Sequence, residues 1–471
     1  MRNYTGSDVI RHDEIEGALE AGRAQAQNKE VVEKILAKAK EAKGLSFSEA
    51  AVLLYVEDQE VLAQMTTIAK QVKEAIYGRR IVLFAPLYVG NYCVNQCQYC
   101  GYQQSNKELT RKKLQMEEID KEIDALLALG HKRIVVEAGE DPVNHPLSFV
   151  IDCINRAYGY ENEQGEKIRR INVNIAATTV DEYRQLKEAN IGTYILFQES
   201  YHRPTYELMH PKGPKSNYDW HTTAMHRAMQ GGIDDVGVGV LFGLYDYHYE
   251  TVAMLMHAEH LEETMGVGPH TVSVPRLRPA TGMDLTQYPH LVNDEEFKKI
   301  VMVLRLAVPY AGMILSTREE GEFRDEVLAL GVSQVSSGSC TGVGGYNAET
   351  EKDPNEKPQF EVGDHRTPQE MIRQLCENGY IPSYCTACYR EGRTGDRFME
   401  LAKSGEIQNV CQPNALLTLE EYLLDHGDEE TTRLGRELIA KEIELIPSPE
   451  IKKMTKERLE DLKQGKRDLY F

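Results

Sequence analysis

Short apolar runs alternate with charged segments of helical pattern along the chain from about residue 80 onward. This alternation is typical of repeated strand–helix units, which build parallel sheets covered by helices. Eight such units closing on themselves predict an α/β fold of the (β/α)8 TIM barrel type, although an open sheet shares much of this periodicity. The predicted strands are Arg80–Leu87, Arg133–Glu137, Ile171–Ala176, Tyr194–Gln198, Val236–Leu241, Thr271–Arg276, Gly312–Ser316 and Gln334–Ser337.

The same pattern divides the chain into three parts. Residues 1–79 are charged and Ala-rich with apolar residues at helical spacing, which predicts an N-terminal helical extension that caps the barrel. Residues 80–346 carry the barrel units. The polar segment Asn347–Lys357 marks the exit from the barrel, and residues 347–471 are predicted to form a mainly helical C-terminal domain. A chain of 471 residues is long enough for one barrel with accessory parts.

The chain is acidic, with 54 basic and 74 acidic residues and a formal net charge of −20. This balance argues against nucleic acid or an anionic membrane as the main partner, since both favour clustered Lys and Arg. No stretch reaches the roughly 18 uninterrupted apolar residues of a membrane span, and the first residues lack the apolar core of a signal peptide. The nine cysteines do not resemble a secreted disulfide framework. We therefore expect a cytoplasmic protein.

Three cysteines, Cys93, Cys97 and Cys100, lie within eight residues directly after the first predicted strand. Soft thiolate ligands select iron–sulfur clusters, zinc or Cu(I). Three thiolates give a 4Fe–4S cluster three protein ligands and leave its fourth iron open, and the next cysteine is distant, at Cys153. Zinc is the alternative, but structural zinc sites usually pair two CxxC hairpins and close with four ligands. The spacing favours a cluster.

A second group of three cysteines, Cys385, Cys388 and Cys411, lies in the predicted C-terminal domain. The segment that follows Cys388 is rich in Arg and Gly, so that guanidinium groups offset the negative charge of a cluster and backbone amides approach its sulfurs. A CxxC pair can instead be a redox dithiol or half of a zinc site. Because the chain already carries one cluster-type triad, a second iron–sulfur site is favoured over these two alternatives.

Polar residues gather just past the ends of the predicted strands, where barrel active sites lie. Arg318 follows the seventh strand, and a bidentate guanidinium would clamp the carboxylate of an amino-acid substrate; its alternative is a rim ion pair with Glu319 or Glu320. The other polar residues at the strand ends are either site residues or ordinary solvated residues of the barrel rim. Expected near the cofactor are Glu137, Gly139, Glu140, Thr178 and Glu199, and expected near the substrate are Arg318, Glu199, Arg278 and Ser337.

His270 opens the sixth predicted strand and so lies at the opposite end of the barrel from the first triad. If the C-terminal domain closes that end, its imidazole is a suitable iron ligand. A lone histidine is more often structural, and His257 and His260 on the preceding helix are rival candidates.

Six stretches together resemble the radical SAM tyrosine lyases that mature FeFe-hydrogenase, and the likeness runs from about residue 45 to the C-terminus. A related family, the tyrosine lyase of thiamine biosynthesis (2-iminoacetate synthase), has a similar barrel but is not expected to carry the second cysteine triad. The stretches are Cys93–Tyr102, Glu137–Pro142, Asn172–Thr179, Gln198–His202, Ile314–Glu319 and Cys385–Phe398.

This resemblance implies two 4Fe–4S clusters and S-adenosyl-L-methionine as cofactors, with Tyr99 and Tyr102 beside the adenosyl group. It implies that L-tyrosine is cleaved between Cα and Cβ to p-cresol and dehydroglycine. Dehydroglycine then gives carbon monoxide and cyanide at the second cluster, which carries an additional iron bridged by a free cysteine or similar amino acid. An electron donor and other hydrogenase maturation proteins are the implied partners.

Two other functions stay open at this point. A thiamine-type tyrosine lyase would stop at dehydroglycine and would not need the second cysteine triad. A non-catalytic iron–sulfur scaffold or redox sensor would need no barrel mouth ringed with carboxylates, hydroxyls and arginines, and the polar strand ends therefore disfavour it.

Overall fold

A closed parallel sheet forms the centre of the computed structural model, which describes residues 3–280, 283–347 and 358–471. The strands follow the order β2-β3-β4-β5-β6-β7-β8-β1, and pairing of β1 with β2 closes the ring. The predicted eight-stranded barrel is therefore confirmed, with strand ends that differ by a few residues. The strands are β1 (Arg80–Gly90), β2 (Arg133–Ala138), β3 (Arg170–Asn174), β4 (Tyr194–Glu199), β5 (Val236–Val240), β6 (Thr271–Ser273), β7 (Gly312–Leu315) and β8 (Gln334–Ser336).

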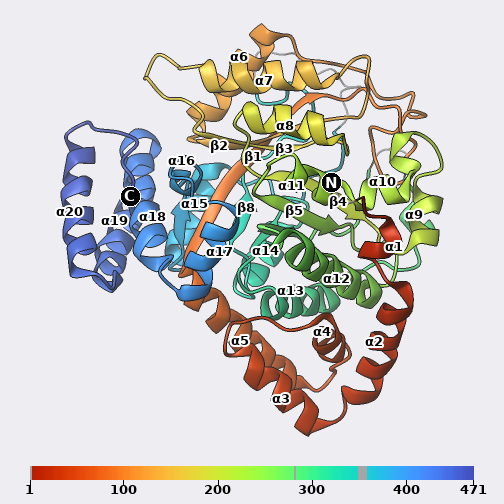
Figure 1. The fold of residues 1–471 in the computed structure, drawn as a ribbon. Coiled ribbons are helices and arrows are strands. Elements are labelled where there is room, and N and C mark those ends of the chain that lie inside the picture. Colours follow the sequence, from red (N-terminus) through yellow and green to blue (C-terminus); the bar gives the residue numbers. More distant parts are fainter. Residues whose placement is uncertain (1–2, 281–282, 348–357) are drawn as a thin grey trace.

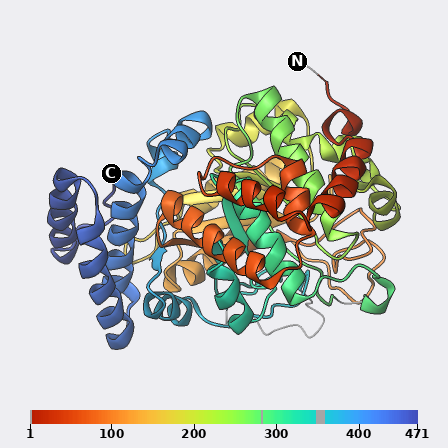
Figure 2. The ribbon, with the colours of Figure 1, turned by 90° about the horizontal axis from the view of Figure 1, so that it is seen from below.

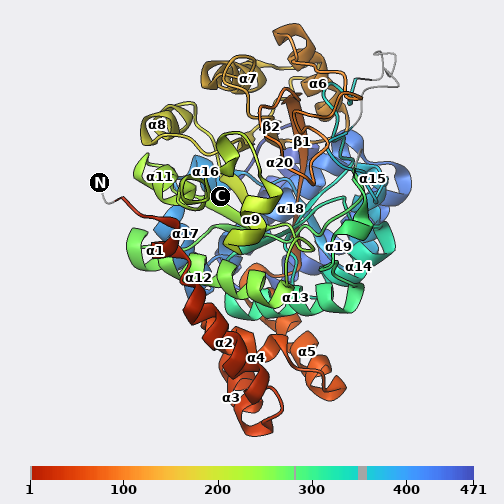
Figure 3. The ribbon, with the colours of Figure 1, turned by 90° about the vertical axis from the view of Figure 1, so that its right-hand side faces the viewer.

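Helices surround the strands as a ring, which Figure 3 shows from the side where β1 and β2 lie. Several of them begin with a capping box, in which a Thr or Asn and a Glu three residues later satisfy each other's backbone amides, as at Thr179 and Glu182. The ring consists of α6 (Met116–Ala128), α7 (Leu147–Gly159), α8 (Val180–Glu188), α11 (Ala224–Gln230), α12 (Tyr247–Met265), α13 (Asp294–Ala307), α14 (Gly321–Leu328) and α15 (Pro368–Glu377). Short helices in the connecting loops are α9 (Arg203–Met209), α10 (Tyr218–Thr222), η1 (Pro214–Ser216) and η2 (Leu285–Gln287).

The N-terminal part is helical, as predicted, and packs on one flank of the barrel (Figure 1). Its helices α4 and α5 contact α13, and α2 and α4 contact α12. In Figure 2 these helices, coloured red to orange, lie across the middle of the molecule. They are α1 (Gly6–Val9), α2 (His12–Gln25), α3 (Lys29–Ala39), α4 (Phe47–Leu54) and α5 (Gln59–Tyr77).

The C-terminal part joins the barrel sheet through a ninth strand, β9 (Ile381–Ser383). This strand pairs in parallel with the beginning of β1, so that Arg80 lies opposite Ile381 and Val82 opposite Ser383. The helix α18 packs against β9 and carries α19 and α20 on its outer side. The helices of this part are α16 (Ala387–Arg390), α17 (Gly395–Ser404), α18 (Gln408–His426), α19 (Glu429–Glu442), η3 (Ile443–Leu445) and α20 (Pro449–Lys463).

The division at residue 346 stays a prediction. Most of the polar segment Asn347–Lys357 that suggested it lies outside the described residues. Among the residues that are described, no helix combines the length and the apolar character needed to cross a membrane.

An apolar layer crosses the middle of the barrel. Phe84, Val135, Ile195 and Ile314 form a separate buried cluster, against which Phe197 packs. Inward-facing residues repeat every second position of a strand, about 6.6 Å apart, and neighbouring strands place them at similar heights. The layer therefore has polar side chains on both sides, from the same strands. On one side are Arg133 and Gln334, and on the other Glu137 and Ser336.

Candidate functional site

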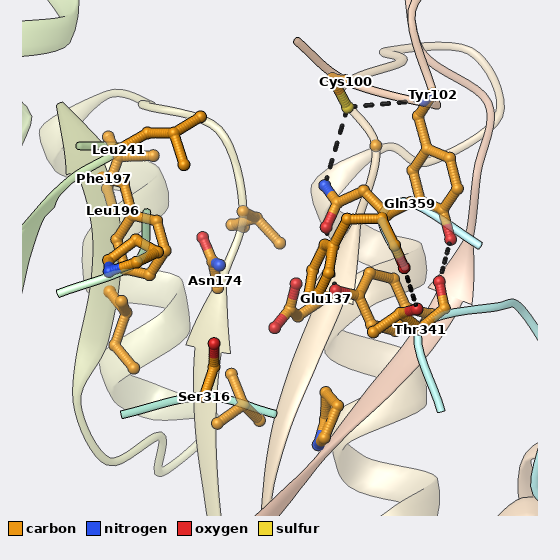
Figure 4. Close-up of a pocket in the computed structure, with 18 of the residues that line it drawn as sticks. Cys100, Tyr102, Glu137, Asn174, Leu196, Phe197, Leu241, Ser316, Thr341 and Gln359 are labelled. Carbon is orange, nitrogen blue, oxygen red and sulfur yellow. Dashed lines mark hydrogen bonds between the residues drawn. The ribbon is translucent and has the colours of Figure 1, made fainter. Parts of the chain in front are cut away.

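A cavity of about 210 Å³ lies at the carboxyl ends of the barrel strands. Figure 4 shows Cys100, Glu137, Asn174 and Ser316 facing the same space. The residues of the sequence prediction that line it are Cys93, Cys97, Cys100, Tyr99, Tyr102, Glu137, Gly139, Glu140, Glu199 and Arg318. The structure thus brings together the first cysteine triad and most of the polar strand ends.

The loop that carries the first triad is fixed by backbone hydrogen bonds to neighbouring loops. The amide of Val94 donates to the carbonyl of Glu140 at 2.8 Å, and the amide of Gln96 donates to the carbonyl of Lys212 at 3.1 Å. Within the loop, the amide of Tyr102 points at the sulfur of Cys100 from 3.4 Å. Such donors offset charge on a thiolate and prepare it to act as a metal ligand.

Gly139 allows this loop to approach the end of β2. A Cβ atom at position 139 would lie 2.3 Å from the carbonyl oxygen of Tyr92 and 3.2 Å from the Cβ of Cys93. The sequence prediction assigned Gly139 to cofactor contact. The structure adds a packing reason for a glycine, because no other residue leaves room for the cysteine loop.

Glu199 ends β4 in a strained conformation. Its φ is 68°, in the left-handed region that non-glycine residues rarely adopt, and the pairing of β4 with β5 shifts register between Phe197 and Glu199. The carboxylate accepts a hydrogen bond from Nζ of Lys215 at 2.8 Å and is buried. Strain of this kind costs about 1–3 kcal/mol and is concentrated at functional sites.

Glu137 lies in the wall of the cavity, near the end of β2. Burial raises the pKa of its carboxyl group to about 7, and the Tyr88 hydroxyl and the Arg318 guanidinium oppose this effect. A carboxyl group that titrates near neutral pH is suited to pair with a cationic ligand or to exchange a proton.

Arg318 lies on the face of the Phe360 ring, with its guanidinium carbon 3.4 Å from the ring centroid. Burial lowers the pKa of the guanidinium, although the nearby Tyr88, Glu199 and Glu137 favour its charge. Within the described residues, this guanidinium has no hydrogen bond or ion pair. The alternative of a rim ion pair with Glu319 or Glu320 is therefore not what the structure shows. A half-buried, unpaired guanidinium in a cavity wall is ready to receive an anion.

Tyr99 contributes its ring to the cavity wall, while its hydroxyl is hydrogen-bonded to Nε2 of His210 at 2.7 Å. Burial raises the pKa of this hydroxyl well above its ordinary value. The ring is thus fixed as a flat, neutral surface beside the cysteine loop.

Three predicted site residues do not line the cavity. The hydroxyl of Thr178 bonds to Glu182 in the first turn of α8. Arg278 donates to Glu319 at 2.6 Å, and the same buried carboxylate also binds Arg276. The hydroxyl of Ser337 is buried and makes no hydrogen bond among the described residues. The geometry gives these side chains no contact with the cavity, so their predicted roles are without structural support.

Several cavity residues were not predicted from the sequence. Lys215 follows a Gly–Pro turn far from any strand end, and Phe360 comes from the segment that returns to the barrel after residue 357. Asn95 is located inside the cysteine loop, where its Nδ2 donates to Glu140 at 2.5 Å. Asn95 could have been found from its place between Cys93 and Cys97. No local sequence pattern indicates Lys215 or Phe360.

A second cavity, about 50 Å³, lies on the other side of the apolar layer and is lined by Cys385, Cys388 and Cys411. His270 lines it as well, so the structure brings this histidine and the second triad together. His257 and His260 do not line it, because they lie elsewhere on α12, where His257 bonds to Tyr201 and His260 to His226.

The second cavity is cationic. Arg80, Arg133 and Arg393 all line it, and the Nε atom of each is buried without a hydrogen-bond partner in the described part of the chain. A hydrogen bond from the Cys388 thiol, together with Arg80 and Arg393, lowers the pKa of Cys411 against the opposing effect of burial. Unpaired buried donors around three cysteines fit an anionic group bound by thiolates.

The nitrogen atoms of His270 suit a metal ligand. Burial lowers the pKa of the imidazole, which keeps it neutral, and its Nδ1 lies 3.5 Å from the Oδ1 atom of Asp235. A carboxylate beside Nδ1 favours the tautomer that leaves Nε2 available to a metal.

Comparison with known proteins places this geometry in a family context. Residues 87–258 match the model of the Radical SAM superfamily, and residues 273–381 match the Biotin and Thiamin Synthesis associated domain. The 2-iminoacetate synthase of Escherichia coli (strain K12) is 30% identical over 322 residues, which cover 68% of this chain and 82% of that protein.

Two solved structures share the whole fold. A crystal structure of HydG, a maturase of the [FeFe]-hydrogenase, is 58% identical with a TM-score of 0.94, and the match covers 98% of this chain and 100% of that one. HydG from Carboxydothermus hydrogenoformans is 38% identical with a TM-score of 0.81, and the match covers 97% and 100% of the two chains.

Substituting Gly139→Ala is expected to displace the first cysteine loop, because the new methyl group would clash with the Tyr92 carbonyl. The variant should lose the iron bound by the first triad and keep that of the second, as measured by anaerobic iron and sulfide quantitation with EPR. The matched control Gly159→Ala, whose methyl group meets nothing within 4 Å, should keep both. Full iron content in Gly139→Ala would contradict this view of the loop.

Substituting Glu137→Gln should change how stability depends on pH. The pKa of the Glu137 carboxyl group is about 7 in the folded protein, against 4.5 for an exposed glutamate of the unfolded chain. The wild type therefore loses stability as the pH rises between these two values, because the carboxyl group ionises at a lower pH in the unfolded chain than in the folded protein. The variant lacks this loss, so above pH 8 it should gain up to about 3 kcal/mol over the wild type. Denaturant unfolding of the cofactor-free protein at pH 5 and 8 measures it, with the exposed Glu188→Gln as control. A pH-independent difference would refute the assignment.

Proposed function

The chain belongs to the radical SAM family that includes 2-iminoacetate synthase, and from this membership we propose that it cleaves the Cα–Cβ bond of L-tyrosine. The products of the first cavity are p-cresol and dehydroglycine, and the second cavity converts dehydroglycine to carbon monoxide and cyanide for FeFe-hydrogenase maturation. One observation carries the proposal: two cysteine triads line two cavities of the same barrel, on opposite sides of its apolar layer.

Membership of the radical SAM family implies a 4Fe–4S cluster and S-adenosylmethionine at the first site. Cys93, Cys97 and Cys100 would hold the cluster and leave one iron for the cofactor. When bound, the two together supply a 5′-deoxyadenosyl radical by reductive cleavage of the cofactor. Glu137 and Glu140 would pair with the cationic methionyl end, and the fixed ring of Tyr99 would pack beside the adenosyl group.

The substrate is oriented by charge at one end and by apolar contact at the other. Arg318 is the unpaired cation of the cavity wall and would clamp the tyrosine carboxylate. Leu196, Phe197 and Leu241 lie together on one side of the cavity, across from Cys100 and Tyr102 (Figure 4), and would exclude water from the adenosyl group and the substrate ring. Fixing both ends holds the substrate's hydrogen donor in one position, which is the main requirement of a radical abstraction.

The positive charge of the second cavity would draw the dehydroglycine fragment from the first cavity towards the second. It is small, carries a carboxylate, and is released next to the apolar layer that separates the two cavities. Arg80 and Arg133 lie directly beyond this layer with unpaired Nε atoms. Since they attract anions, the fragment moves from the first cavity towards the second.

At the second site, Cys385, Cys388 and Cys411 would hold an auxiliary 4Fe–4S cluster, with His270 as the protein ligand of an additional iron. Three guanidinium groups offset the negative charge of such a cluster. Asp235 would orient His270 through Nδ1. A free cysteine or similar amino acid bridging to the additional iron, an electron donor for the first cluster and other maturation proteins complete the proposed set of partners.

Substituting Arg318→Lys is expected to lower kcat/KM for tyrosine by roughly 10- to 100-fold, because a point charge replaces a bidentate clamp. Production of 5′-deoxyadenosine without tyrosine should be unchanged, since no tyrosine carboxylate is bound there. Arg278→Lys should have a much smaller effect, because Arg278 binds Glu319 outside the cavity. Chromatographic quantitation of p-cresol measures both. An equal loss of kcat/KM in the two variants would show that Arg318 does not bind the tyrosine carboxylate.

Substituting Cys388→Ser separates the full reaction from that of a thiamine-type lyase. The variant should form p-cresol at the normal rate but neither carbon monoxide nor cyanide, because the second triad is incomplete. Cys376→Ala, at a buried cysteine outside both triads, is the control and should form all three. Normal formation of carbon monoxide and cyanide by Cys388→Ser would assign the chain to the lyases that stop at dehydroglycine. Absence of p-cresol and 5′-deoxyadenosine from the wild type would leave only a scaffold or sensor.

A further inference from the structure

Arg318 lines the first cavity without a carboxylate partner among the described residues, although two glutamates follow it directly in the chain. A guanidinium pairs readily with a carboxylate that it can reach, so the free state of Arg318 has a cause in the structure. Glu320 is exposed and Glu319 is only 1% exposed, yet neither lines the cavity. The buried neighbour Glu319 is thus turned away from the cavity that Arg318 faces.

Two other arginines occupy the carboxylate of Glu319. Arg276 donates from Nε to both oxygens at 3.0 Å and from Nη2 to Oε2 at 2.6 Å. Arg278 donates from Nη2 to the same Oε2 atom at 2.6 Å. Hydrogen bonds between charged groups are the strong ones, and water hardly reaches this carboxylate. Glu319 is therefore bound to the loop after β6 and is not available to Arg318.

Arg276 is itself fixed by the helices around it. Its Nη2 atom lies 2.7 Å from Oδ1 of Asp294, at the beginning of α13. Its guanidinium carbon lies 5.1 Å from the ring centroid of Phe297 on α13 and 4.7 Å from that of Phe323 on α14. The partner of Glu319 is thus a packed part of the barrel wall and not a side chain of the solvated rim.

The residue before Arg318 is anchored as well. The amide of Thr317 donates to Oγ of Ser336 at 3.0 Å, and its carbonyl accepts the amides of Gly363 at 2.8 Å and Asp364 at 3.1 Å. The turn is therefore held on both sides of Arg318. The guanidinium, which makes no hydrogen bond in the described part of the chain, takes its position from this backbone and from the aromatic ring on which it lies.

We propose that Glu319, clamped by Arg276 and Arg278, is a positioning residue that keeps Arg318 unpaired and directed at the carboxylate of the amino-acid substrate. Glu319 does not touch the substrate and acts through Arg318. Its position matters because a displacement of about 1 Å at a binding group costs on the order of 100-fold in rate. The inference rests on the proposed function, in which Arg318 binds the tyrosine carboxylate. It gives Arg278 an indirect role in place of the substrate contact expected from the sequence.

The test compares the affinities of L-tyrosine and tyramine, which lacks the carboxylate, by isothermal titration calorimetry on the anaerobic holoenzyme without reductant. The wild type should bind L-tyrosine roughly 10- to 100-fold more tightly than tyramine, because only L-tyrosine forms charged hydrogen bonds with Arg318. In the isosteric variant Glu319→Gln this preference should fall about tenfold or more, because the turn that carries Arg318 is released. The affinity for tyramine should not change.

Glu320→Gln is the matched control, because it removes the same charge one residue further along the chain. The Glu320 side chain is exposed and makes no capping hydrogen bond at the beginning of α14. This variant should keep the full preference for L-tyrosine. An undiminished preference in Glu319→Gln would overturn the proposal, as would an equal loss of affinity for L-tyrosine and tyramine.

A double variant separates positioning from stability. Glu319→Gln leaves two arginines on a neutral partner, which should lower the unfolding temperature, since removing one member of a buried ion pair is destabilising. Arg278→Gln combined with Glu319→Gln removes one of these charges and should recover part of the stability but not the preference for L-tyrosine. A preference that returned together with the stability would contradict the positioning role.

The p-cresol assay separates this inference from the proposed function. If the wild type prefers L-tyrosine, Glu319→Gln loses that preference and neither forms p-cresol, the proposed reaction fails and the positioning role stands. If the wild type forms p-cresol and Glu319→Gln keeps the preference, only the positioning role fails.

Discussion

The arrangement of both sites depends on the parallel pairing of one long strand. The eleven residues of β1 pair with β8 and β9 near their beginning and with β2 near their end. Every second residue of this strand faces the barrel interior, so Val82 lines the second cavity, Phe84 the apolar layer, and Pro86 the first cavity. The strand then leads directly into the first cysteine loop, while its partner β9 leads into the second. One strand therefore fixes the distance and the orientation of the two cysteine triads.

The two cavities differ in charge in the way their proposed ligands require. The first contains the carboxylates Glu137, Glu140 and Glu199 and suits a cofactor with a cationic methionyl end, whereas the proposed role of Arg318 is to bind an anionic substrate group. The second is lined by three arginines and suits anionic species. The apolar layer lies between them, so the two cavities differ in charge although they belong to one barrel.

Features that depend on local pattern were predictable, and features that depend on distant partners were not. The eight strands follow from the apolar periodicity, and the cysteine triads follow from spacing, so Arg318, Glu137 and Glu199 could be placed at strand ends before the structure was known. Arg278 follows a predicted strand as Arg318 does, but its partner Glu319 lies forty-one residues further along the chain. Lys215, Phe360 and Asp235 reach their cavities through loops whose paths no local pattern encodes. The three residues of β9 are too few for a periodicity to be read.

The segment that follows residue 357 makes the barrel and the C-terminal helices inseparable. Gln359 and Phe360 complete the wall of the first cavity, and Gly363 and Asp364 donate backbone amides to Thr317 at the end of β7. Asp364 also anchors the segment by ion pairs with Arg324 and Arg366. Truncation of the chain at the end of the eight-stranded ring would thus remove part of the wall of the first cavity along with the second cysteine triad. The barrel and the C-terminal part therefore cannot be separated at this boundary without opening the first cavity.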